Sequence, residues 1–359
     1  IRPKDPIFYE SDGMLMYHFR NDYSEGAHPQ VLDALIRTNL ESTAGYGEDP
    51  YCAAAAEAVR ARFGCTDGAV HFLVGGTQTN FTAISAFLRP WEAAVAVDTG
   101  HIAVHETGAV EARGHKVITV PHENGKMTPQ ALLEVCSQHE GGNPGHMVLP
   151  RLLYLSDSTE LGTVYTRAEL EALHDLCRQR NLYLYLDGAR LAAALTCEEN
   201  DLTPEDLPRL CDAFTMGGTK NGLLFGECLV IVNPALMPNF RFALKQGGGM
   251  LAKGRLLGVQ FEAMLENGDY TRLAARANDL AQELKRAFVD HGCALFSDTA
   301  ANQIFPILPD EAARRLATGY SFSFWERVDD THQAVRFCTN VTTDRADVDA
   351  LLRDIGRAF

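Results

Sequence analysis

The chain is poor in lysine, with 7 lysines against 25 arginines among 359 residues. It is also short of positive charge overall, because 47 acidic residues outnumber 32 basic ones and leave a net charge of −15. A nucleic-acid partner needs an excess of basic residues on some surface, so this composition argues against one. No apolar stretch of 18 residues occurs, which argues against a membrane span. A hydrophobic fraction of 46% with 22% charged residues is typical of a soluble globular protein with a sizeable core.

Several common motifs are also missing. The 9 cysteines are odd in number, scattered and never spaced as C-x-x-C, which fits reduced thiols better than a disulfide framework or a zinc site. No signal-like apolar segment follows Ile1, so we expect a cytoplasmic protein. The sequence contains no H-E-x-x-H, G-x-G-x-x-G or G-x-x-x-x-G-K-[ST] pattern, which removes the usual support for zinc-protease, dinucleotide and P-loop functions. We therefore expect no metal site.

Apolar runs and helical patterns alternate between about residues 69 and 235. The capping box Thr166-Arg167-Ala168-Glu169, for example, opens a helix after one such run. Strands separated by helices give a mostly parallel sheet covered on both faces, with ligands at the carboxyl ends of the strands. The seven strands are predicted over 69–74, 95–97, 116–120, 151–155, 182–186, 213–216 and 227–232.

The pattern changes after about residue 236. A helical stretch that includes 273–289 leads into short apolar runs at 304–308 and 334–337, and a last helix is predicted over 345–359. Three parts follow from this reading. They are an N-terminal segment (1–20), a large domain (21–235) and a smaller α+β domain (236–359).

Three polar groups are predicted to lie at strand ends. Lys220 follows the apolar segment 211–216 in a glycine-rich turn, Asp187 ends the run 182–186, and a Gly75-Gly76-Thr77 turn follows the first strand. A pyridoxal phosphate enzyme needs such a set. The lysine binds the cofactor covalently, the carboxylate keeps the ring nitrogen protonated so that the ring attracts electrons, and backbone N–H groups at a helix start hold the phosphate.

These residues resemble those of a known family. The stretches Gly75–Asn80 and Asp187–Arg190, followed by Lys220, are similar to the motifs of the low-specificity threonine aldolases, which have the aspartate-aminotransferase fold (fold type I). Tyr46-Gly47-Glu48-Asp49-Pro50 and Gly247-Gly248-Gly249-Met250 add to the likeness, which extends from about residue 17 to the end. Ser158–Gly162 and Thr219–Gly222 look closest to the phenylserine-aldolase-like branch.

The resemblance implies a role for each matching residue, and an assembly. The protein would be a homotetramer built of dimers, with Tyr46 reaching into a neighbouring subunit. Its substrates would be L-β-hydroxy-α-amino acids, cleaved to glycine and an aldehyde. The implied catalytic residues are Lys220, His101 and Glu160; the cofactor-binding residues are Gly76, Thr77, Gln78, His101, Asp187, Arg190, Thr219 and Lys220; and the substrate-binding residues are Asn21, Tyr46, Arg190 and Arg336.

Two positions depart from the family pattern, and alternatives stay open. Asn21-Asp22 stands where many members have Ser-Asp, and Glu160 stands where many have a histidine near the substrate hydroxyl. The identity of the base is therefore open, with His101 the next candidate. A β-eliminating lyase or an aminotransferase would use the same cofactor residues. A cofactor carrier or a catalytically silent relative is the alternative from another class.

Overall fold

A seven-stranded sheet forms the centre of the computed structural model, which describes residues 17–141 and 145–359. Its spatial order is β2-β8-β7-β6-β5-β3-β4. Strand β8 runs antiparallel to both of its neighbours, and every other pair is parallel. The prediction of a mostly parallel sheet is confirmed, and each predicted strand is present: β2 (Ala69–Leu73), β3 (Glu92–Val97), β4 (Val117–Val120), β5 (Leu149–Ser156), β6 (Tyr183–Asp187), β7 (Ala213–Gly217) and β8 (Glu227–Ile231).

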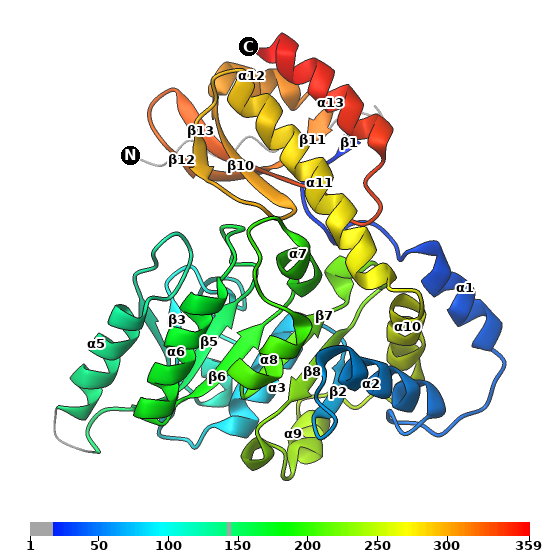
Figure 1. Cartoon of the computed structure of the whole chain (residues 1–359), viewed down its shortest axis with the longest axis vertical. Helices are drawn as coiled ribbons and strands as arrows, with labels where there is room; N and C mark the ends of the chain where they lie inside the picture. Colours follow the sequence, from blue (N-terminus) through cyan, green and yellow to red (C-terminus); the bar gives the residue numbers. More distant parts are fainter. Residues whose placement is uncertain (1–16, 142–144) are drawn as a thin grey trace.

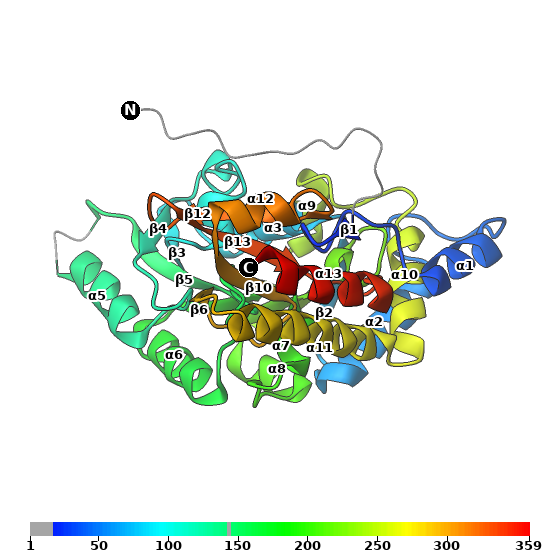
Figure 2. The ribbon, with the colours of Figure 1, turned by 90° about the horizontal axis from the view of Figure 1, so that it is seen from above.

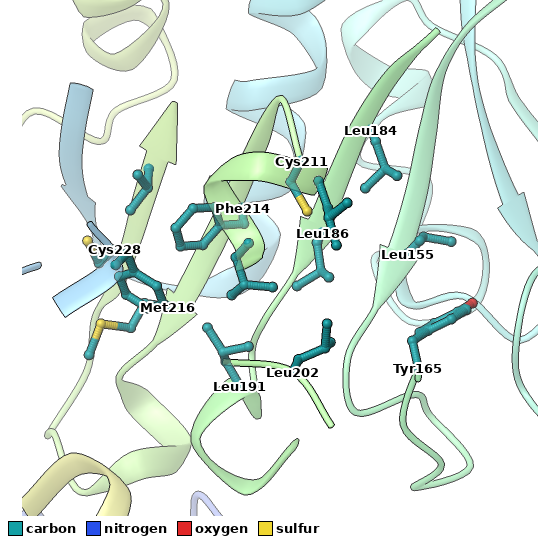
Figure 3. Close-up of a cluster of buried hydrophobic side chains, with 14 of the residues drawn as sticks. Leu155, Tyr165, Leu184, Leu186, Leu191, Leu202, Cys211, Phe214, Met216 and Cys228 are labelled. Atoms are coloured by element: carbon teal, nitrogen blue, oxygen red, sulfur yellow. The ribbon is translucent and has the colours of Figure 1, made fainter. Parts of the chain in front are cut away.

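Helices cover both faces of this sheet. Successive strand residues point to opposite faces, so Val95 and Val97 join one hydrophobic cluster whereas Ala94 and Ala96 join another. Figure 2 shows helices α3 (Gly76–Phe87) and α9 (Phe240–Gln246) on one side and α5 (Pro129–Glu140), α6 (Arg167–Arg180) and α8 (Leu207–Leu210) on the other. The first cluster also holds the side chains drawn in Figure 3, among them Leu155, Leu184, Leu186, Phe214 and Met216. Because both faces are buried, the strands are almost continuously apolar.

Helices α5 and α6 begin where the sequence signals predict. Thr166 and Glu169 form the expected capping box of α6, and Thr128 caps α5 with Pro129 at its first position. In the described residues, no helix is long and apolar enough to cross a membrane. The helices up to α9 are α1 (Pro29–Thr38), α2 (Pro50–Phe63), α3 (Gly76–Phe87), α4 (His101–Val104), α5 (Pro129–Glu140), α6 (Arg167–Arg180), α7 (Leu191–Thr196), α8 (Leu207–Leu210) and α9 (Phe240–Gln246).

A second, antiparallel sheet of order β12-β13-β10-β9 lies beyond the carboxyl ends of the large sheet (Figure 1). Its strands are β9 (Leu295–Ser297), β10 (Gln303–Pro309), β12 (Ser323–Arg327) and β13 (His332–Cys338). Helices α11 (Asp269–Asp290), α12 (Asp310–Leu316) and α13 (Arg345–Ala358) pack against it around a separate core that includes Phe288 and Phe337.

The start of the described chain joins this C-terminal part. Strand β1 (Tyr17–His18) pairs in parallel with β11 (Tyr320–Ser321), and Phe19 is buried in the C-terminal core. The predicted N-terminal segment 1–20 lies outside the described residues except for its last four positions. The boundary placed at 235 stays a prediction.

Helix α10 (Arg255–Glu266) follows that boundary in the sequence but packs against α1 and α2. The contact with α2 is unusually close, because a Cβ atom added to Gly258 would lie 2.4 Å from the backbone nitrogen of Cys52. Only glycine leaves room for the two helices to approach backbone to backbone at this point.

We predict that Gly258→Ala destabilises the protein. Alanine favours a helix over glycine by about 1 kcal/mol, but overpacking typically costs about 1–3 kcal/mol, and here the obstacle is backbone rather than a flexible side chain. We expect the free energy of unfolding, from urea titration at fixed protein concentration, to fall by roughly 1–2 kcal/mol. Gly319→Ala is the control, since nothing lies within 4 Å of its added Cβ. Equal midpoints for the two variants would contradict the prediction.

Candidate active site

The candidate site lies at the carboxyl ends of the large sheet. Strand β6 ends at Asp187, β7 leads to Lys220, β3 leads to His101 at the start of α4, and Glu160 follows β5. Parallel strands bring their carboxyl ends to one edge of a sheet. The structure thus brings these four residues together, and the charges of Lys220 and His101 both act on Asp187.

Asp187 is a buried carboxylate with a full set of hydrogen-bond donors. Its Oδ2 accepts from Tyr154 Oη at 2.7 Å and from Asn80 Nδ2 at 2.8 Å, and its Oδ1 accepts from the backbone N of Ala189 at 2.9 Å. Burial alone would raise the pKa of Asp187, but the charge of His101 and these hydrogen bonds outweigh it and lower the pKa. Asp187 therefore stays ionised, as a partner for a protonated ring nitrogen must.

Lys220 lies in a short 3-10 helix, η3 (Thr219–Asn221), in the connection between β7 and β8. The backbone N–H groups of Gly218 and Thr219 both donate to the carbonyl oxygen of Gly226 at 3.0 Å, which fixes this turn against the start of β8. Burial is the largest cause that lowers the pKa of Lys220, and the charge of Arg190 adds to it. A larger share of the lysine is therefore the neutral amine that a covalent bond to a carbonyl compound requires.

His101 is held by two acidic residues. Its Nδ1 lies 2.8 Å from Glu106 Oε1, and its backbone N donates to Glu160 Oε1 at 2.8 Å. Burial acts to lower the pKa of His101, but the hydrogen bond to Glu106 and the charges of Asp187 and Glu106 raise it overall. The imidazole side chain keeps 34% of its surface exposed, so a planar ligand can reach it.

Glu160 has one engaged oxygen and one free oxygen. Its Oε1 accepts from Ser156 Oγ at 2.6 Å as well as from the backbone of His101. Its Oε2 is buried without a hydrogen-bond partner among the described residues. Burial is the main reason that the pKa of Glu160 is raised.

The two arginines of the expected carboxylate clamp have different surroundings. Arg190 donates to both oxygens of Asp22, from Nε at 2.6 Å and from Nη2 at 3.0 Å. Arg336 donates to Gln303 Oε1 and to the carbonyl oxygen of Arg20, both at 3.2 Å. Neither contact contradicts a role in substrate binding, which stays a prediction for both. Asp22, directly after Asn21, is thus the partner of a clamp residue.

The start of α3 offers an open cradle. No side chain caps this helix, and nothing lies within 4 Å of a Cβ added to Gly75 or Gly76. Backbone N–H groups at such a helix end favour an anion. The side chain of Gln78 is already engaged, because it bonds to the backbone of Val74 and of Gly247, so any contact of Gln78 with a phosphate would come from its backbone N–H.

Tyr46 does not join the other site residues within one chain. Its side chain is 47% exposed, and Lys245 Nζ lies 4.7 Å from the centre of its ring. Asn21 and Thr219 serve their local turns instead. Asn21 Oδ1 accepts from Tyr23 N and Ser24 Oγ, and Thr219 Oγ1 bonds to the backbone of Gly226.

Sequence reasoning missed several residues that surround this set. Most of them are polar groups within otherwise apolar strands or helices, which is the signal that could have revealed them, whereas Glu106 lies in the bend after α4. Glu227 is one example. It begins the buried strand β8 and accepts from Gly218 N at 3.2 Å, and burial raises its pKa to about 7. The others that contact the named residues are Asn80, Glu106, Tyr154 and Ser156.

The residues fit the pyridoxal phosphate that the resemblance implies. Lys220 Nζ makes no hydrogen bond or ion pair in the described ranges, Asp187 is held ionised, and the uncapped end of α3 can accept a phosphate. An amine, a carboxylate and an anion cradle are the three groups that this cofactor requires of a protein.

Comparison with known proteins gives one consistent family. The beta-eliminating lyase family matches residues 18–310. A low-specificity L-threonine aldolase of Pseudomonas sp. is 33% identical over 303 residues, which cover 83% of this chain and 86% of that protein. The corresponding enzyme of Pseudomonas aeruginosa is 31% identical, covering 94% of this chain and 96% of that protein.

Solved structures agree with this family assignment. A threonine aldolase of Leishmania major superposes with a TM-score of 0.93 at 43% identity, covering 95% of this chain and 99% of that one. An aspartate aminotransferase of Thermus thermophilus shares the fold alone, with a TM-score of 0.68 and 16% identity over 97% of this chain and 92% of that one. The chain therefore belongs to the beta-eliminating lyase family, and within it to the threonine aldolases of low specificity.

Proposed function

We propose that this protein cleaves L-β-hydroxy-α-amino acids of the threonine or phenylserine type to glycine and an aldehyde, with pyridoxal phosphate bound at Lys220. The observation that carries the proposal is the meeting of a lysine of lowered pKa with an ionised, buried Asp187 in a chain of the threonine aldolase family. The reaction is a retro-aldol cleavage of the Cα–Cβ bond, so the enzyme is a carbon–carbon lyase.

The proposal assigns these residues roles in holding the cofactor. Lys220 would bind it covalently, Asp187 would pair with the ring nitrogen, and His101 would contact the ring. The N-terminus of α3, with Gly76, Thr77 and Gln78, binds the phosphate together with Thr219. When bound, pyridoxal phosphate attracts electrons from the Cα atom of an attached amino acid. Arg190, paired with Asp22, is close enough to Lys220 for its charge to lower the pKa of that lysine.

The protein's own residues then direct the reaction. Arg190 and Arg336 bind the substrate α-carboxylate, because a guanidinium matches a carboxylate with two parallel hydrogen bonds. A carboxylate held in one position sets the orientation of the bonds at Cα and so determines which of them can break. Asn21 lies beside Asp22 and contributes to the same pocket. Glu160 accepts the proton of the substrate β-hydroxyl at its free Oε2, since Ser156 and the His101 backbone occupy Oε1.

We further propose a homotetramer in the cytoplasm. Leu32, Ile36 and Leu40 form an exposed apolar stripe along α1 and just beyond its end, and Phe242 on α9 is 76% exposed. Such apolar surface is typical of a subunit interface. Tyr46 would reach the site of a neighbouring subunit there.

The cysteines bear on the compartment. All nine are free and buried, which fits a reducing compartment such as the cytoplasm.

The first test concerns Lys220 and the reaction together. The purified protein should be yellow, lose its colour with borohydride, and form glycine from threonine or phenylserine. Lys220→Ala should lose the colour and nearly all turnover with an unchanged circular dichroism spectrum, because the lysine serves the cofactor rather than the core. The exposed Lys116→Ala is the control. A keto acid from threonine in place of glycine, or indole from tryptophan, would instead indicate a β-eliminating lyase or an aminotransferase.

Arg336→Ala should weaken substrate binding. Loss of one member of a buried, charged hydrogen-bonded pair costs about 2–5 kcal/mol, so we expect kcat/KM to fall by roughly 30-fold or more. Arg336→Lys should recover part of the loss, since it keeps the charge but not the paired geometry. Arg327→Ala, on the exposed side of β12, is the control. If Arg336→Ala keeps the parental kcat/KM, Arg336 is not part of the carboxylate clamp.

Glu160→Gln should slow the cleavage of β-hydroxy amino acids by roughly 10²–10⁴-fold, the usual effect of losing a general base. Exchange of the glycine α-proton should persist, because it involves no β-hydroxyl. A base acts when ionised, so kcat/KM should fall as the pH drops through the raised pKa of Glu160, and this acid limb should vanish in the variant. The exposed Glu171→Gln is the control. Parental rates in Glu160→Gln would leave His101 as the base.

A further inference from the structure

Glu106 contacts the Nδ1 edge of the His101 ring. Its side chain has no exposed surface. Its Oε1 receives two contacts, from His101 Nδ1 and from Asn80 Nδ2, each at 2.8 Å. The same Asn80 Nδ2 also donates to Asp187 Oδ2 at 2.8 Å. A single amide therefore joins the two buried carboxylates, and one of them holds the histidine.

The protons of this cluster can be assigned by counting donors and acceptors. Asn80 Oδ1 accepts from Tyr185 Oη at 2.9 Å, so the amide is oriented with its NH₂ group toward Glu106 and Asp187. An NH₂ group has two hydrogens and no acceptor. Both carboxylate oxygens that it meets therefore accept from it. Because an imidazole nitrogen is a stronger base than a carboxylate oxygen, the hydrogen of the contact between Nδ1 and Glu106 belongs to His101.

We propose that Glu106 is the positioning residue of His101. It holds the imidazole with Nδ1 protonated and leaves Nε2 as the ring nitrogen that can exchange a proton with a ligand. This inference deepens the proposed function and rests on it only for the consequence in catalysis. The hydrogen bond made by one ring nitrogen of a histidine sets the state of the other, and Asn80 fixes Glu106 in the orientation that does so.

The balance of charge explains why a buried glutamate is present. An ionised carboxylate without solvent costs several kcal/mol unless an opposite charge balances it, and Glu106 Oε2 has no partner within the described residues. Asp187 and Glu160 are acidic and cannot balance it. Among the groups around His101, which also include Lys220 and His105, the histidine itself is the one in direct contact. The protonated imidazole and Glu106 therefore form a matched pair.

The test is ¹⁵N NMR of the histidine-labelled holoenzyme, with the His101 signals assigned by their loss in His101→Asn. In the parent, we expect any neutral His101 to carry its proton on Nδ1. In Glu106→Gln, we expect the pKa of His101 to fall by about one unit or more, because a neutral amide replaces the charged partner. We also expect kcat to fall about 10–100-fold with KM nearly unchanged and cofactor content retained. Glu106→Asp should recover part of both effects.

The control is Glu111→Gln, five residues further along at an exposed position, which should titrate like the parent. A proton on Nε2 of neutral His101 in the parent would overturn the proposal without any variant. So would the same His101 titration in Glu106→Gln and Glu111→Gln. If the parent forms no glycine from any β-hydroxy amino acid, the proposed function fails, but the NMR result still decides the role of Glu106.

Discussion

Keeping Asp187 ionised inside the protein is the constraint on which the rest of the site depends. A buried carboxylate tends to take up a proton, and only several donors together prevent it. The groups that prevent it come from four separate segments. Asn80 on α3, Tyr154 on β5 and Ala189 after β6 donate hydrogen bonds, and His101 on α4 contributes its charge. The large sheet serves to bring these segments to one edge.

The antiparallel strand β8 places the lysine. The chain makes a tight connection from β7 to β8, and Lys220 lies in it, close to Asp187 on the neighbouring strand. Glycine is required in this connection, since a Cβ added to Gly218 would lie 2.6 Å from the carbonyl oxygen of Gly226. The lysine is thus held by backbone hydrogen bonds rather than by its side chain, which leaves its amine free to form a covalent bond.

The sequence predicted the strands and the main residues of the site because both depend on local patterns. Apolar runs bounded by turn residues gave all seven strands, and Lys220 and Asp187 follow such runs directly. The direction of β8 could not be predicted, since apolar periodicity does not report which strands pair. The pairing of Arg190 with Asp22 could not be predicted from local patterns either, because the two residues lie 168 positions apart in the sequence. Glu106, only five residues after His101, follows a four-residue helix, where no helical spacing links the two.

Glu160 places a second carboxyl group beside His101 and near Asp187. Burial raises the pKa of Glu160, whereas Glu106 and Asp187 raise the pKa of His101 despite its burial. The backbone N–H of His101 also donates to Glu160, so both groups are fixed in one arrangement. A change at position 160 would therefore alter the protonation of His101 as well, and the two residues are better regarded as one acid–base unit than as independent candidates for the base.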